Sequence, residues 1–269
     1  MVLLEKYHFF RYNANYEGDL MFIDTHCHLS KKDYEDINKV IQANKEAGVP
    51  LIVISGCNKE DMEETLQLAN QYQEVYATIG YHPEEAEMIT KEDLKSLEEK
   101  LSCQKVIGIG EIGLDYHYRK DNKNKQQELF QNQLELAIKY HLPVVIHSRD
   151  ATEDTINILK KYKVKGIMHC FSGSIETAKI YIKLGFYLGI GGVVTFKNSN
   201  LKKTLEEIPL EKIVLETDSP YLAPEPYRGT QNSSKNIPII ASTIAAVKKV
   251  SLEEVEKITS HNAKTLFNL

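Results

Sequence analysis

Two histidines separated by one residue, His26 and His28, end an apolar stretch that begins at Phe22. Side chains at positions i and i+2 of a β-strand point to the same face of the sheet, so this spacing aims both imidazoles at one point. Imidazoles held rigidly on one face are suited to binding a metal ion. Because the His-x-His spacing also arises often by chance, the pair indicates a metal site only if the rest of the chain supplies further ligands.

The elements that would position such ligands alternate regularly along the chain. Short apolar segments typical of buried strands lie near residues 22–28, 50–55, 75–81, 105–113, 143–148, 166–170, 186–192 and 213–219. Helical patterns separate these segments, and two more, near 238–250 and 251–267, close the chain. Near-continuous apolar strands between helices predict a parallel sheet covered on both faces. Eight such units at this length predict an α/β fold, a (β/α)8 TIM barrel in a single domain; an open doubly wound sheet is the alternative.

No linker or shift in composition divides the 269 residues into two domains. We therefore assign residues 21–269 to one barrel domain and residues 1–20 to an N-terminal extension of uncertain role. Met21 could be an alternative start, or the extension could be an aromatic strap packed on the barrel. The segment 220–236 is rich in Pro, Gly, Asn and Ser and is long for a connection after a strand, so it is a candidate active-site flap.

Polar residues that can ligate a metal fall at the carboxyl ends of the expected strands. They are His26, His28, His82, Glu111, His147, His169 and Asp218. In a closed barrel all these strand ends meet at one rim, where barrel enzymes carry their chemistry. The clustering of five of the nine histidines at these positions is therefore the strongest functional signal in the sequence.

Each of these residues also has a purely structural explanation. A single histidine at a strand end, such as His147 or His169, is more often a hydrogen-bonded rim residue than a ligand. Glu111 could be a buried carboxylate paired with an arginine such as Arg149, and Asp218 could cap the loop that follows it. Taken together these explanations would require four histidines and two carboxylates to converge without a shared purpose, in a region where unpaired charge is costly. The combination therefore favours a metal site.

The predicted ligand set consists of nitrogen and oxygen atoms, with no thiolate. Such a set suits Zn, Mn, Mg, Fe or Co. Six candidate ligands exceed what one tetrahedral ion with an open position needs, so two divalent ions that share a bridging carboxylate fit better. Glu111 is the natural bridge, because its strand lies between the strand of the histidine pair and those of the later histidines. Asp218 could bind the first ion and accept a proton from the attacking water, and two such ions can hold the leaving oxygen of a phosphoester.

In the order of its motifs the chain resembles the TatD family of metal-dependent deoxyribonucleases, within the amidohydrolase-like barrel superfamily. The stretches that carry the resemblance are IDTHCHL (23–29), IGYHP (79–83), GIGEIGLD (108–115), PVVIHSR (143–149), HCFSG (169–173) and LETDSPYL (215–222). The resemblance implies a (β/α)8 barrel, two divalent metals and hydrolysis of phosphodiester bonds in DNA. It implies that one ion is held by His26, His28, Glu111 and Asp218, and the other by Glu111, His147 and His169.

The loop after the eighth strand departs from the family pattern. In the family this loop usually reads Arg-Gly-Lys-Arg-Asn-Glu-Pro, whereas residues 228–234 here read RGTQNSS. Arg228, Gly229 and Asn232 remain, but the two cations are replaced by Thr230 and Gln231. If the flap grips phosphates, binding of polymeric DNA should be weaker and less dependent on salt, and a small phosphoester becomes a more plausible substrate.

Several further residues could support the site. Arg149 and Arg228 could contact a phosphate, although Arg149 could equally form a structural ion pair with Asp150 or Asp115. His82 is not needed as a ligand and is assigned to substrate contact or proton transfer. Glu216 shares a strand face with Asp218 by its spacing and could orient a ligand. Cys27 points away from the two histidines beside it and is assigned to packing.

Composition restricts the possible binding partners and the cellular location of the protein. The formal net charge of −5 and the pI of about 6.0 argue against a wide basic surface for duplex nucleic acid, but do not exclude a nuclease whose metals hold phosphates. No apolar run approaches the length of a membrane span, and no obligate protein partner is evident. The four cysteines form no Cys-x-x-Cys pair, which favours free thiols in a reducing compartment and hence a cytoplasmic location.

Three functional hypotheses follow. The first is a two-metal hydrolase of phosphoesters, in particular a deoxyribonuclease. The second keeps the barrel but changes the bond to a lactone, an amide or the target of a deaminase; several such relatives bridge their metals with a modified lysine on the fourth strand, where this chain carries Glu111. The third is a non-catalytic metal-binding partner protein, against which the complete ligand set speaks.

Overall fold

The computed structural model describes residues 20–269, so the extension expected over residues 1–20 lies outside the described residues apart from Leu20. Eight parallel strands form one sheet in which each strand lies beside its neighbour in the sequence. The strands are β1 (Ile23–Cys27), β2 (Leu51–Gly56), β3 (Val75–Ile79), β4 (Val106–Asp115), β5 (Val144–Arg149), β6 (Gly166–Met168), β7 (Phe186–Ile190) and β8 (Ile213–Leu215).

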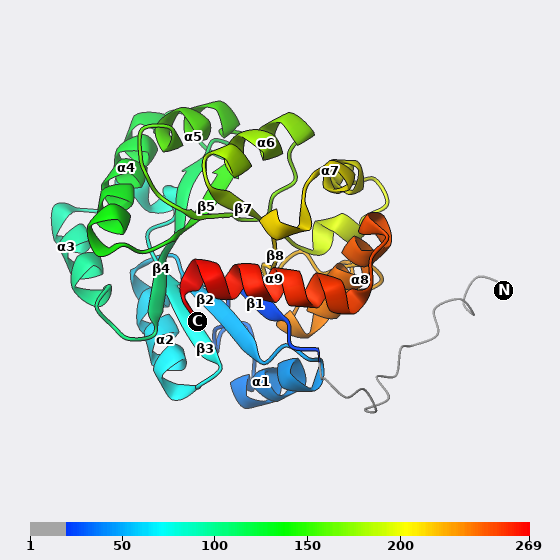
Figure 1. Ribbon diagram of the computed structural model, residues 1–269. Helices are drawn as coiled ribbons and strands as arrows, with labels where there is room; N and C mark the ends of the chain where they lie inside the picture. Colours follow the sequence, from blue (N-terminus) through cyan, green and yellow to red (C-terminus); the bar gives the residue numbers. More distant parts are fainter. Residues whose placement is uncertain (1–19) are drawn as a thin grey trace.

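Helices follow the strands and surround the sheet (Figure 1). They are α1 (Ile37–Glu46), α2 (Lys59–Gln71), α3 (Lys91–Lys100), α4 (Lys123–Tyr140), α5 (Thr152–Leu159), α6 (Ile175–Lys183), α7 (Leu201–Glu207), α8 (Ile237–Lys248) and α9 (Leu252–Phe267). Side-chain caps explain where several begin: Thr90 and Asp93 form the capping box expected at the start of α3, and Asp36 caps α1. The alternation of strand and helix confirms the single-domain α/β barrel.

The sheet closes between β1 and β8 through hydrogen bonds that are not a regular strand ladder. Near the top of this seam, the backbone N–H of Asp218 donates to the carbonyl of His26 at 3.0 Å, and that of His28 donates to the carbonyl of Ser219 at 2.6 Å. Nearer the amino-terminal end of the seam, a side chain makes the link, because the Thr25 hydroxyl donates to the carbonyl of Leu215 at 2.9 Å. The alternative of an open doubly wound sheet is therefore wrong.

A buried carboxylate completes the seam between β1 and β8. The carboxylate of Asp24 accepts two hydrogen bonds from Thr217, one from the hydroxyl at 2.5 Å and one from the backbone N–H of Thr217 at 3.0 Å. Both side chains are fully buried, so these bonds satisfy polar groups that would otherwise be costly inside the barrel wall. The seam thus fixes the chain immediately before the histidine pair.

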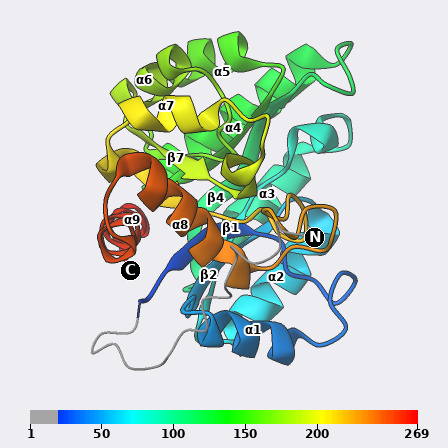
Figure 2. The ribbon, with the colours of Figure 1, turned by 90° about the vertical axis from the view of Figure 1, so that its right-hand side faces the viewer.

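The amino-terminal end of the barrel is closed by apolar packing. One buried cluster joins apolar residues of five strands to Ala263 and Phe267 of α9. The strand residues are Ile23, Val53, Val145, Ile167 and Val214. Figure 1 shows α9, in red, lying across the strands. In Figure 2, α9 lies on the left and the orange segment that follows β8 on the right, so the two close opposite ends of the barrel. The polar strand ends therefore face the side away from α9.

Two strand boundaries differ from the sequence-based expectation and matter for the site. β4 continues to Asp115, beyond the expected end at Gly113, because Gly113 and Asp115 still pair in register with His147 and Arg149 of β5. β8 ends at Leu215, well before the expected Ser219. Asp218 has a φ of 55°, in the left-handed region, so the chain has left the strand conformation before this residue.

The segment 220–236, expected to be a flap, is anchored in its second half. Asn232 is fully buried, and its amide donates to the carbonyls of Thr217 at 2.9 Å and Tyr221 at 2.7 Å. The hydroxyl of Tyr34 donates to the carbonyl of Asn232 at 2.8 Å. The stretch around Arg228 remains exposed. The exposed part of this segment therefore lies before Asn232. Within residues 20–269, no helix has the length and apolar character needed to cross a membrane.

Candidate metal centre

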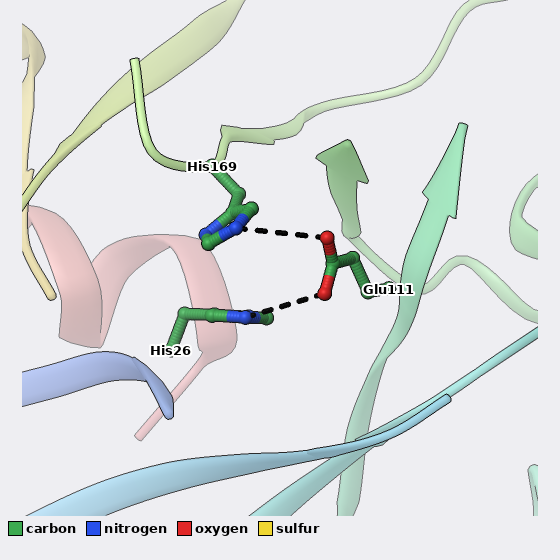
Figure 3. A group of neighbouring side chains, drawn as sticks. All are labelled: His26, Glu111 and His169. Atoms are coloured by element: carbon green, nitrogen blue, oxygen red, sulfur yellow. Dashed lines mark ion pairs between the residues drawn. The ribbon is translucent and has the colours of Figure 1, made fainter. Parts of the chain in front are cut away.

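The predicted ligands meet at the carboxyl-terminal rim, around the side chain of Glu111. His26 lies on β1, His28 just after it, Glu111 on β4 and His147 on β5, while His169 and Asp218 follow β6 and β8. Figure 3 shows that the two oxygens of Glu111 face different histidines, with Oε2 toward His26 and Oε1 toward His169. Five strands thus contribute to one cluster, and the carboxylate of Glu111 lies at its centre.

One half of the cluster surrounds Oε2 of Glu111. This oxygen lies 3.5 Å from Nε2 of His26 and 3.7 Å from Nε2 of His28. Oδ1 of Asp218 lies 3.5 Å from the same two nitrogens. His26, His28 and Asp218 form one of the groups whose ligand atoms are close enough to share an ion.

The other half surrounds Oε1 of Glu111. Nδ1 of His147 lies at 2.6 Å, Nε2 of His169 at 3.6 Å and Nε2 of His82 at 3.9 Å from this oxygen. In this half, His82, Glu111 and His147 form a group that could share an ion. A further group, of His26, Glu111 and His169, spans the two halves. An ion could bind His147 here only if the hydrogen bond between His147 and Glu111 were broken. This half is therefore less ready to bind an ion than the half around Oε2.

The distances in the first half fit a metal ion. Ligand nitrogens and oxygens at about 2.0–2.2 Å from a tetrahedral ion lie about 3.3–3.5 Å from one another. The 3.5 Å separations between His26 and the two carboxylates match this spacing. Nε2 of His26 is also buried without a hydrogen-bond partner, which is costly unless something else binds it. The donor set and this unpaired nitrogen together fit a divalent ion.

The charges of the cluster support each other when no ion is bound. Burial by itself would lower the pKa of His26, but the carboxylates of Asp218 and Glu111, each 3.5 Å from its Nε2, outweigh this effect and raise the pKa to about 10. In the same way the pKa of His28 rises to about 9 against the effect of burial, mainly through Asp218. Burial opposes ionisation of Glu111 and Asp218, yet the neighbouring histidines hold the pKa of both carboxyls well below the ordinary range. Binding of an ion would therefore replace protons on the histidines.

A further layer of side chains fixes the orientation of each imidazole. Nδ1 of His26 lies 3.1 Å from the hydroxyl of Ser55, which leaves Nε2 to face the carboxylates. Nδ1 of His169 lies 3.2 Å from Oε1 of Glu216, which also accepts a bond from the backbone N–H of Cys170 at 2.5 Å. Partners of this kind select the tautomer and the ring orientation of metal-binding histidines.

Glu216 takes this position for a different reason from the one expected. The shared strand face with Asp218 does not exist, because β8 ends before both residues. Glu216 instead reaches His169, while Asp218 turns toward the histidine pair of β1.

Asp115 was missed as a member of this layer, since it was considered only as a partner of Arg149. Nε2 of His147 lies 2.9 Å from Oδ2 of Asp115, and the backbone N–H of His117 donates to Oδ1 at 2.8 Å. The i, i+4 spacing from Glu111 to Asp115 on a longer strand was the signal that could have revealed it. Burial by itself would lower the pKa of His147. The contacts with Asp115 and then Glu111 outweigh burial and raise the pKa to about 9.

His82 lies at the edge of the cluster, as its place after β3 predicted. Its ring centroid is 4.5 Å from that of His147. Burial lowers the pKa of His82 to about 4, so its imidazole is neutral near pH 7. A neutral histidine beside the centre can accept or relay a proton.

The two arginines do not join the cluster. The guanidinium of Arg149 lies 5.0 Å from the ring centroid of Tyr118, and that of Arg228 lies 4.3 Å from the ring centroid of Phe196. Arg149 makes no ion pair with Asp150 or Asp115 among the described residues: His117 pairs with Asp150 at 3.0 Å, and Asp115 contacts His147. Both arginines are exposed on the rim and so are accessible to a ligand.

A cysteine also reaches the centre, although no role was assigned to it from the sequence. Sγ of Cys57, in the loop after β2, lies 3.8 Å from Oε2 of Glu111 and 4.0 Å from Nδ1 of His28. Burial and the charge of Glu111 raise the pKa of the thiol, so it retains its proton without an ion. Cys27 is buried in the core, as expected, and its thiol faces the carbonyl of Val53. All four cysteines lie in the described part of the chain, and each is a free thiol.

Comparison with known proteins agrees with this geometry. The model of the family described as TatD related DNase matches residues 23–268. The chain belongs to this family. An uncharacterized metal-dependent hydrolase of Bacillus subtilis is 43% identical over 93% of this chain and 100% of its own length. The crystal structure of a TatD homolog from Escherichia coli has 31% identity and a TM-score of 0.87, over 94% of this chain and all of that one.

A further member of the TatD family, a hydrolase from Entamoeba histolytica, has a crystal structure with 26% identity and a TM-score of 0.84, covering 92% of this chain and 98% of that one. These similarities identify the protein as a metal-dependent hydrolase with a TIM-barrel-like fold. The His/Glu clusters at the rim are the part of this chain that can bind metal ions.

Proposed function

We propose that this TatD-family protein hydrolyses phosphoester bonds and acts as a deoxyribonuclease, with water activated between two divalent ions. The observation that carries the proposal is the position of Glu111, whose two oxygens face two different groups of histidines. A carboxylate shared in this way is suited to bridging two ions. Two ions a few ångström apart match the needs of phosphoester hydrolysis, where both the attacking and the leaving oxygen carry charge.

The ligands are assigned by the two halves of the cluster. We assign the first ion to His26, His28, Glu111 and Asp218, and the second to Glu111, His147 and His169. The first set fits the observed separations, whereas the second requires His147 to release its hydrogen bond to Glu111. Nitrogen and oxygen ligands suit Zn, Mg or Mn, and they leave the choice of ion to measurement.

The residues of the chain would share the chemical work as follows. Bound divalent ions lower the pKa of a water molecule and neutralise the charge of the phosphate. Asp218 stays ionised at neutral pH and is placed beside His26 and His28, so its carboxylate can accept the proton of the attacking water. Glu111 stays ionised for the same reason and supplies the negative charge at the centre of the site. Neutral His82 lies next to this carboxylate and can contact the substrate or pass on a proton.

The rim supplies two places where a substrate could be held. Arg149 with Tyr118 lies on the side of β4 and β5, and Arg228 with Phe196 on the side of β7 and β8. Guanidinium groups bind phosphate well, and aromatic rings stack on bases, so each pair offers both kinds of contact. Next to Asp115, Tyr118 and Arg119 lies a hollow of about 200 Å³, which is too small for more than a fragment of a nucleic acid. Either DNA or a small phosphoester is compatible with this rim.

The test is a comparison of bonds on one preparation. The protein is stripped with a chelator, reloaded with Mg, Mn or Zn, analysed for metal content, and assayed on DNA, on a small phosphodiester, on a lactone and on an amide. We expect phosphodiester turnover that requires added metal. Faster turnover of the lactone or the amide would replace the proposal by another hydrolase of the same barrel. No turnover on any ester by fully loaded protein would favour the non-catalytic metal-binding protein.

The altered flap allows a second test that concerns only the size of the substrate. Thr230 and Gln231 are exposed beside Arg228, where the family pattern has two cations. The double change Thr230→Lys with Gln231→Arg should raise activity on polymeric DNA and make it more sensitive to salt, while leaving a small phosphodiester unaffected. Equal effects on both substrates would show that this part of the loop does not contact the polymer.

A further inference from the structure

Cys57 differs from Cys27 and Cys103 in what its sulfur touches, whereas Cys170 lies beside His169 and Glu216. Cys57 follows β2 at the rim, half-buried, and contacts Oε2 of Glu111 at 3.8 Å and Nδ1 of His28 at 4.0 Å. Cys27, by comparison, is buried among apolar side chains and faces a backbone carbonyl. Cys103 is packed against the outer part of the core. The sulfur of Cys57 is therefore part of the polar rim.

Three different donors converge on one oxygen of Glu111. Oε2 lies 3.5 Å from Nε2 of His26, 3.7 Å from Nε2 of His28 and 3.8 Å from Sγ of Cys57. His28, Cys57 and Glu111 place one ligand atom each within 4.8 Å of one another. Nε2 of His26, on the same oxygen, is buried and has no hydrogen-bond partner. This unpaired nitrogen indicates independently that an ion belongs at this point.

The spacing of the sulfur fits the same ion. Cys57 would be the fifth protein ligand of this ion, so the ion would be five-coordinate rather than tetrahedral. With a zinc–sulfur distance of about 2.3 Å and a zinc–oxygen distance of about 2.0–2.2 Å, two ligands about 120° apart lie about 3.8 Å from each other. The observed 3.8 Å between Sγ of Cys57 and Oε2 of Glu111 matches this separation. On binding, the thiol loses its proton to the solvent and the sulfur forms one bond to the divalent ion, with no change of oxidation state.

We propose that Cys57 is a thiolate ligand of the first ion and biases the centre toward thiophilic ions such as Zn²⁺ and Co²⁺ over Mg²⁺ and Mn²⁺. The proposal rests on the ion site proposed above for His26, His28, Glu111 and Asp218. Softer sulfur ligands select softer metals, whereas a site of carboxylates and imidazoles alone accepts a wider range. Cys57, in the loop after β2, would thus add one sulfur ligand to a set that otherwise consists of nitrogen and oxygen atoms.

The experiment uses the full chain, stripped of metal and titrated with Co²⁺. We expect visible cobalt absorption together with a thiolate-to-cobalt charge-transfer band in the near ultraviolet. Cys57→Ser should lose the charge-transfer band but keep the visible absorption, which shows that the ion is still bound. Cys103→Ser is the matched control, a thiol remote from the rim, and should keep both bands. Competition between Zn²⁺ and Mn²⁺ should show the preference for zinc falling about 10–100-fold in Cys57→Ser alone.

The possible contrary results have different meanings. A charge-transfer band that persists in Cys57→Ser, or that disappears only in Cys170→Ser, would overturn the role of Cys57 and leave the ion site intact. An unchanged ratio of zinc to manganese affinity would overturn the proposed selectivity. The absence of any cobalt absorption in the wild-type protein would overturn both this proposal and the metal centre on which it rests.

Discussion

The two ends of the barrel are built from the same strands but have opposite chemistry. At the amino-terminal end, apolar side chains of five strands pack against Ala263 and Phe267 of α9. At the carboxyl-terminal end, buried imidazoles and carboxylates face one another, and Nε2 of His26 and Nδ1 of His169 have no hydrogen-bond partner. The first arrangement gains stability from burial of apolar surface, whereas the second holds charged groups that are costly to bury. Stability and function should therefore respond separately to changes at the two ends.

The largest separation is expected for Glu111→Gln, which keeps the size of the side chain but removes its charge. Activity on a phosphodiester should fall at least about 10³-fold, as for other groups that act on the reacting atoms. The barrel should remain folded, because the neighbouring histidines can lose their protons when the carboxylate is removed. Turnover, metal content and thermal unfolding measured on the same samples test this. Glu211→Gln, at an exposed site, is the control, and full activity of Glu111→Gln would disprove the bridging role.

Phe267→Ala is the counterpart at the other end. Phe267 is 4% exposed and fills the base of the barrel, so the change should lower the free energy of unfolding by about 3–5 kcal/mol. Below the unfolding transition, the affinity for metal and the activity per folded molecule should stay close to wild type. Denaturant unfolding and metal titration provide the two measurements. A loss of metal affinity as large as the loss of stability would mean that the two ends are coupled.

Glu216→Gln tests whether the layer behind the ligands belongs to function rather than to stability. The amide oxygen can still accept the bond from Cys170, but the charge facing Nδ1 of His169 is lost. Metal affinity should fall about 10–100-fold, as is usual when the partner of a metal-binding histidine is changed. Isothermal titration with Zn²⁺ gives the affinity, and unfolding of the metal-free variant serves as the comparison. Unchanged affinity would reduce Glu216 to a structural role.

The smallest effect is expected outside the ligand cluster, at the start of α3. Lys59, 2.8 Å away, and the capping bonds of Thr90 lower the pKa of Asp93 to about 2. Because the folded state favours the ionised form, its stabilisation should be complete above about pH 4 and lost as the pH falls toward 2. Asp93→Asn should thus lower the melting temperature slightly at pH 6 and hardly at all near pH 2. An effect independent of pH would show that the amide caps the helix equally well.

Sequence reasoning recovered the barrel and the residues on its rim for a physical reason. Apolar strands separated by helices can bury both faces only in a parallel sheet, and closure brings the carboxyl ends of all strands together. Residues as distant as His26 and Asp218 could therefore be placed in one cluster without any knowledge of their contacts. The assignment of individual ligands to each ion stays a prediction.

The parts that were missed depend on where the strands end and on single contacts across the rim. Asp115 was considered only as a partner of Arg149, because β4 was expected to stop at Gly113, and pattern alone does not determine how far a strand continues to pair. Glu216 contacts His169, but not through the expected strand face shared with Asp218, because the left-handed conformation of Asp218 is not encoded in the alternation of side chains. Cys57 lies in a loop, and its distance to Glu111 depends on the three-dimensional arrangement of β2 and β4.

The seam between β1 and β8 has a consequence for the order of folding. It joins Thr25 to Leu215, which are 190 positions apart, so its formation carries a larger loop-closure entropy than the pairing of neighbouring strands. Contacts of such long range are expected to form late. His26 and Asp218 stand on opposite sides of this seam, joined by a hydrogen bond between their backbones. A partly folded chain therefore lacks the complete set of ligands, and the ability to hydrolyse a substrate should appear only with the last step of folding.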